Sequence, residues 1–161
     1  MTIIEAMVAV LILSLGLIPV FNTLLLANNF SSAIKNNLIA ANLAQEGVEV
    51  VRALRDQEWL AYNCFGSVCG SSLVGTWIVQ WNSNWALPST LPQPVGANPP
   101  LNIDASGLYT YGSGTPTNFR RKVTVTEPVP GVQLQVVVEV TWPEKNSTQT
   151  ITVESHLYNW K

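Results

Sequence analysis

The sequence predicts an α+β protein in which a long N-terminal α-helix packs on an antiparallel β-meander head. Two observations lead to this prediction. An apolar stretch at the N-terminus continues into a segment with helical periodicity, and three runs near the C-terminus alternate between apolar and polar residues. We therefore divide the 161 residues into a helix over residues 1–56 and a globular β-sheet head over residues 57–161.

The composition excludes several classes of function. Charged residues make up 11% of the chain, against roughly 25% in a typical soluble domain, and the net charge of −2 gives no basic field for nucleic acid. Two cysteines, one histidine and the two aspartates Asp56 and Asp104 supply too few ligands for zinc or carboxylate-rich metal sites. Since no phosphate loop or nucleophile elbow occurs either, we expect no enzyme activity, no metal and no cofactor.

The first part of the helix is apolar on all sides. Residues 6–34, between Glu5 and Lys35, carry no charge, and residues 6–27 alone exceed the roughly 20 residues that span a bilayer core. No basic residue precedes the run, unlike in a cleaved secretory signal. Gly16 and Pro19 lower helix propensity by about 1 and 3 kcal/mol. These two helix-breaking residues alone are equally consistent with a kinked membrane helix and with a segment that becomes extended outside lipid.

Residues 29–56 are predicted to be the amphipathic half of the same helix, which follows a membrane or filament-core half over residues 1–28. Apolar residues recur at helical steps of three and four, at Ile34, Leu38, Ala41, Ala44, Val48, Val51 and Leu54. The opposite face is polar, and Glu49, Arg52 and Asp56 are spaced for weak surface ion pairs. A helix of this length measures roughly 80 Å, and its second half needs a surface on which to lie.

The motif Thr2-Ile3-Ile4-Glu5 and the apolar run after it resemble the N-terminus of type IV pilins, minor pilins and type II secretion pseudopilins. The family pattern is an aromatic residue or Met, then Thr-Leu-Ile-Glu; here Ile3 replaces the commoner Leu and Met1 the commoner Phe. Residues 41–52 are similar to the second half of such helices. The resemblance, which covers about residues 1–58, implies the type IV pilin fold. It also implies a subunit that polymerises into a cell-surface filament for attachment or motility.

The family also implies roles for individual residues. A prepilin peptidase would remove a leader and methylate Met1 as the mature N-terminus; the alternative is that Met1 is an unprocessed start. Glu5 would pair with the terminal amine of a neighbouring subunit during assembly; the alternative is an acid at the membrane interface. Gly16 and Pro19 match the region in which the helix melts inside the filament.

The partners that the resemblance implies are other copies of the chain in a helical homopolymer, the peptidase, and the inner-membrane assembly machinery. Membrane lipid would surround the single span before assembly. The alternatives are a minor pilin or pseudopilin at a filament tip, and a membrane-anchored adhesin. The scarcity of Asp argues against a calcium-holding pseudopilin head.

The head is predicted to be a meander. Strands are expected at residues 73–81 and 108–111 and in three alternating runs over residues 119–126, 132–142 and 150–157. The turn sequences Pro128-Val129-Pro130-Gly131 and 143–147 separate the last three. Residues 86–118 are otherwise expected to be loop.

Other motifs in the head give weaker predictions. An extracytoplasmic location favours a disulfide between Cys64 and Cys69, with zinc the weaker alternative. The run Arg120-Arg121-Lys122 is interpreted as a solvated strand edge rather than a DNA contact, and His156 as a surface histidine. The six Trp are read as core and subunit-contact residues before adhesive ones. Asn29 and Asn146 match the N-glycosylation pattern, of which only Asn146 falls in a turn.

Overall fold

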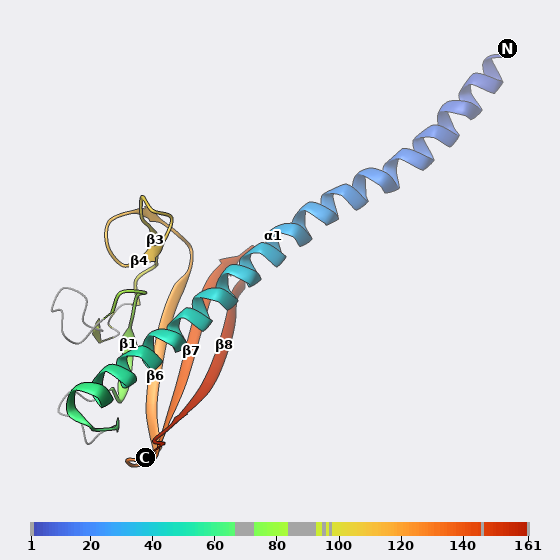
Figure 1. Cartoon of the computed structure of the whole chain (residues 1–161). Coiled ribbons are helices and arrows are strands. Elements are labelled where there is room, and N and C mark those ends of the chain that lie inside the picture. Colours follow the sequence, from blue (N-terminus) through green and yellow to red (C-terminus); the bar gives the residue numbers. More distant parts are fainter. Residues whose placement is uncertain are drawn as a thin grey trace. The chain divides into compact units, whose positions relative to one another are not determined.

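Helix α1 runs without interruption over Ile3–Tyr62 in this computed structural model (Figure 1). The structure describes residues 2–66, 73–83, 93–94, 96, 98–145 and 147–160, and for Asn29 and Gln93 the backbone alone. The helix ends at Tyr62 rather than near residue 56. Asn63 adopts a left-handed φ of 50° and its N–H donates to the carbonyl oxygen of Trp59 at 2.9 Å, which caps the helix.

The chain divides into two compact units, Met1–Leu38 and Ile39–Lys161. The first contains only the N-terminal part of α1. The second contains the rest of α1 and every strand of the described residues, so the amphipathic half of the helix belongs to the same unit as the sheet from Ile39 onward. The predicted fold class, α+β with a long N-terminal helix and an antiparallel sheet, is confirmed.

The main sheet is antiparallel throughout, with the order β2-β1-β6-β7-β8. Its strands are β1 (Gly75–Ile78), β2 (Gln93–Pro94), β6 (Arg120–Val129), β7 (Gln133–Glu144) and β8 (Ser147–Tyr158). The three alternating runs form the predicted meander β6–β7–β8. The strands extend further into the turns than expected: β6 continues through Pro128, where its register with β7 shifts, and β7 continues through Pro143.

A small second sheet lies where the sequence predicted mostly loop. Its strands β3 (Asn102–Ile103), β4 (Tyr109–Thr110) and β5 (Thr115–Pro116) are ordered β4-β3-β5. The prediction found only β4. Strands of two residues have no measurable alternation, so their pairing depends on tertiary contacts rather than on a sequence pattern.

The core of the Ile39–Lys161 unit forms between α1 and one face of the main sheet (Figure 1). From α1 it contains Ala40, Leu43, Ala44, Val48, Val50, Val51 and Leu54. From β7 it contains the alternating residues Leu134, Val136, Val138 and Val140, each with no exposed surface. The predicted helix face is correct from Ala44 onward, but Ile34, Leu38 and Ala41 are exposed, so that part of the prediction is wrong.

Arg121 is fully buried, which corrects the interpretation of residues 120–122 as one solvated basic edge. One guanidinium nitrogen, Nη1, donates to the carbonyl oxygen of Leu43 and to Oε1 of Glu46, both at 3.0 Å. The other, Nη2, donates to the carbonyl oxygen of Val79 at 2.5 Å. Arg121 on β6 therefore connects α1 with the segment that follows β1.

The contact between Arg121 and α1 has room because residue 47 of the helix is a glycine. A Cβ atom at this position would lie 2.9 Å from Cγ1 of Val138 and 3.3 Å from Cδ of Arg121. The Tyr111 hydroxyl donates to the backbone oxygen of Arg121 at 3.0 Å. Burial raises the pKa of Tyr111, against the opposing effect of the Arg121 charge, which keeps the hydroxyl protonated as a donor. The absence of a side chain at residue 47 is thus a packing requirement.

Candidate functional site

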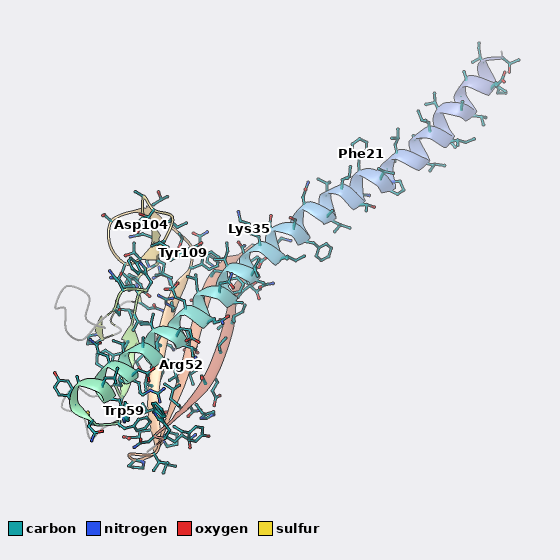
Figure 2. All side chains as sticks on the ribbon, in the orientation of Figure 1. Phe21, Lys35, Arg52, Trp59, Asp104 and Tyr109 are labelled. Carbon is teal, nitrogen blue, oxygen red and sulfur yellow. The ribbon has the colours of Figure 1, made fainter. Side chains whose placement is uncertain are left out.

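The N-terminal part of α1 presents an apolar surface. Every large apolar side chain from Ile3 to Leu38 is between 46% and 83% exposed. Figure 2 shows side chains of this segment, with Phe21 labelled, projecting from the ribbon. Among the described residues α1 is the one helix long and apolar enough to cross a membrane. Apolar surface of this extent marks a region that contacts lipid or protein.

Glu5 is the only charged residue of this surface before Lys35. It lies exposed in the first turn of α1, where its N–H and that of Ala6 donate to the Thr2 carbonyl oxygen at 3.1 and 3.3 Å. No side chain in the described part of the chain forms an ion pair with Glu5. Met1 lies outside the described residues, so its methylation stays a prediction. If this surface is covered by lipid or protein, the Glu5 carboxylate will need a partner from another molecule, because burying an unpaired charge is costly.

Gly16 and Pro19 lie inside unbroken helix. Pro19 has no N–H for the carbonyl oxygen of Leu15, and a Cβ atom on Gly16 would meet nothing within 4 Å. Nearby hydroxyls bond to the helix itself: Ser14 Oγ donates to the Leu11 oxygen at 2.9 Å and Thr23 Oγ1 to the Pro19 oxygen at 2.8 Å. In the single chain both breakers are accommodated; their role in melting the helix inside a filament stays a prediction.

The predicted residues of the head belong to the Ile39–Lys161 unit. Cys64 is disulfide-bonded, and Cys69 lies outside the described residues, so the pairing itself stays a prediction. His156 is exposed and lies 3.0 Å from Oε1 of Glu154, as expected for a surface histidine. The described residues include no group of three His, Cys, Asp or Glu side chains arranged to hold a metal.

The remaining two members of the basic run are engaged at the surface. Arg120 donates to the Asn98 carbonyl oxygen, and Lys122 forms an ion pair with Glu139. With Arg121 buried, the three cations do not form one basic patch. The glycosylation motifs are not located, because Asn146 and the side chain of Asn29 lie outside the described residues.

Two features of the head were missed by sequence reasoning. The first is the buried contact of Arg121 with α1, for which a signal existed: Arg121 has the same strand parity as the buried Phe119 and Val123. The second is an aromatic contact between Trp59 and Trp160, whose ring centroids are 5.0 Å apart. No sequence pattern connects these two residues, because Trp59 lies in the last turn of α1 and Trp160 lies just after the end of β8.

Comparison with known proteins adds no assignment: no protein-family model, no curated protein and no solved structure matches this chain.

Proposed function

We propose that this chain is the structural subunit of a type IV pilus, which polymerises through the N-terminal part of α1 into an extracellular filament. The filament would serve surface attachment, motility or both. The observation that carries the proposal is the exposed, uncharged helical surface over residues 6–34, preceded by the lone acid Glu5. The resemblance of residues 2–12 to the N-terminus of type IV pilins supports it.

The length of the apolar surface favours polymerisation over simple anchoring. At 1.5 Å per residue, residues 6–34 form a helix roughly 43 Å long, whereas a bilayer core is about 30 Å thick. Leu38 continues the exposed apolar surface beyond residue 34, and Phe30 and Ile34 already lie past the roughly 20 residues that span a bilayer core. An anchor has no need of this extra surface, but packing against α1 of other copies would cover it.

Glu5 also favours polymerisation over simple anchoring. A carboxylate within the hydrocarbon region costs about 2.5–3.5 kcal/mol on an insertion scale, and an anchor gains nothing from it. The α-amino group of another copy is mostly cationic at neutral pH, since its reference pKa is near 8. Pairing would compensate both buried charges and fix the axial position of one subunit against the next.

The remaining partners follow from this proposal. Before assembly the subunit would lie in the cytoplasmic membrane as a single span, after a prepilin peptidase has produced Met1 as a methylated N-terminus. The inner-membrane assembly machinery would then transfer it to the filament. The alternatives are a minor pilin or pseudopilin at a filament tip and an anchored adhesin, for which the same membrane-crossing helix would be sufficient.

A truncation tests whether α1 drives association. We expect a chain of residues 30–161 to be a soluble monomer by size-exclusion chromatography with light scattering, because most of the apolar surface is absent. The full chain, freed of detergent, should form filaments visible by electron microscopy. Stable filaments of the truncated chain would show that the head carries assembly, and monomeric full chain would favour an anchor.

Gly16 and Pro19 give a second expected result. Inside the filament we expect the backbone over residues 15–22 to be non-helical, with helix resuming near residues 23–26, because neighbouring helices replace lipid and polar side chains supply hydrogen bonds. An extended residue rises about 3.3 Å against 1.5 Å in a helix, so the double change Gly16→Ala, Pro19→Ala should shorten the subunit or prevent assembly. A filament map with unbroken helix over residues 3–54 would contradict this expectation.

A further inference from the structure

An aromatic cleft lies within the Ile39–Lys161 unit, where the end of α1 meets the end of the chain. The rings of Trp59 and Trp160 contact each other in a tilted arrangement, with centroids 5.0 Å apart and an interplanar angle of 31°. Asp56 and Leu60, which are neighbours of Trp59 on α1, complete a cleft of about 190 Å³. Figure 2 labels Trp59 in the last turns of α1.

Backbone contacts hold the end of the chain in this position. The N–H of Asn159 donates to the carbonyl oxygen of Val132 at 2.8 Å, and its side-chain amide donates to the oxygen of Gly131 at 3.0 Å. On the other side, Nη1 of Arg55 donates to the backbone oxygen of Tyr158 at 3.1 Å. These bonds hold the two residues that precede Trp160, and 69% of the surface of Trp160 is exposed. An exposed indole on an anchored segment is suited to contact a ligand.

The charges around the cleft decide which class of ligand fits. Asp56 Oδ1 lies 2.6 Å from Nε of Arg55, so the one charged side chain that lines the cleft among the described residues already has a cationic neighbour, which disfavours an organic cation as the ligand. A sugar ring matches the other features of the cleft, which are an exposed indole ring and a carboxylate oxygen. Its C–H face packs on an indole ring, and its hydroxyls donate to a carboxylate oxygen. The volume, below the roughly 300–1,000 Å³ of a drug-sized pocket, suits one ring.

We propose that this cleft binds one ring of a neutral saccharide, with the ring face on Trp160 and a hydroxyl hydrogen-bonded to Asp56. The site lies within one chain, so it does not require polymerisation. It would let the chain recognise glycans whether it acts in a filament or as a membrane-anchored monomer. The proposal therefore stands or falls separately from the proposed function.

The test uses the full chain in lipid nanodiscs without glycolipid, because sugar-based detergents would compete. Saturation-transfer NMR with cellobiose, maltose and N,N′-diacetylchitobiose should detect binding of at least one of them. Trp160→Leu keeps an apolar side chain against Trp59 but removes the ring face, and should weaken that binding about tenfold. The matched control Trp81→Phe, at another half-exposed tryptophan, should leave the affinity unchanged.

A second variant distinguishes a sugar ligand from a cationic ligand. Asp56→Asn keeps an acceptor oxygen but no charge, so sugar affinity should change by less than about threefold. Tetramethylammonium is the cationic probe. The proposal is overturned if none of the three sugars binds, if Trp160→Leu binds as tightly as the parent chain, or if tetramethylammonium binds and is lost in Asp56→Asn.

Discussion

Glu5→Ala is expected to abolish filaments while leaving the subunit in the membrane. In the proposed assembly Glu5 is the only side chain of the apolar surface that can pair with the terminal amine of another copy, because the next charge is Lys35. Removing one member of a buried ion pair costs about 3–5 kcal/mol, which weakens subunit addition at least a hundredfold. Filament yield by shearing and electron microscopy, beside the amount of subunit in membranes, measures both effects.

Two further variants make this experiment specific. Glu5→Gln keeps the size and polarity of the side chain and should also fail, since the missing property is the charge. Glu49→Ala is the matched control: Glu49 is another exposed acid of α1, and among the described residues its one ion pair is with Arg52, at 2.8 Å. Normal filament yield and length from Glu5→Ala would show that Glu5 has no pairing role.

Arg121→Met should be the most destabilising single change in the head among those considered. The variant preserves much of the volume but removes the buried donor to the carbonyl oxygens of Leu43 and Val79, of which the Leu43 oxygen keeps its bond within the helix. It also removes the partner of Glu46. Each unsatisfied buried group costs about 1–3 kcal/mol, so we expect a loss of about 3 kcal/mol in the free energy of unfolding.

The adjacent residue supplies the control. Arg120 is exposed and, within the described part of the chain, donates to the Asn98 oxygen alone, so Arg120→Met should change stability by no more than about 0.5 kcal/mol. Gly47→Ala tests the same contact from the helix side, since its new methyl group would meet Val138 and Arg121. Urea unfolding of the full chain in detergent, followed by tryptophan emission, gives the comparison. Equal midpoints for Arg121→Met and Arg120→Met would refute the assigned role.

The long helix and the long strands of the fold could be predicted because each has a sequence pattern that extends over many residues. Residues 6–34 have no charge to interrupt them, and the period-two alternation of β7 from Leu134 to Val140 specifies a strand with one buried face. The end of α1 was placed too early because the last turns carry no apolar period, whereas the cap that ends them is the backbone of Asn63.

The side of α1 that packs on the sheet could be predicted only in part. Ile34, Leu38 and Ala41 continue a helical stripe as well as Ala40 and Leu43 do, and periodicity does not say where one packing surface stops. Arg121 was misread because a basic run was treated as one unit, although alternation along a strand separates Arg121 from both neighbours. The Trp59–Trp160 cleft depends on the end of α1 and the segment after β8, which only the tertiary fold brings together.

The central claim, that this chain is the main subunit of a filament assembled through α1, has one direct measurement. Filaments are sheared from the surface of the source cells, imaged by electron microscopy, and their main protein is identified by mass spectrometry. The account predicts that the main protein is this chain, with a methylated Met1 at its N-terminus. Filaments that consist of another protein, with this chain found only in the membrane fraction, would contradict it.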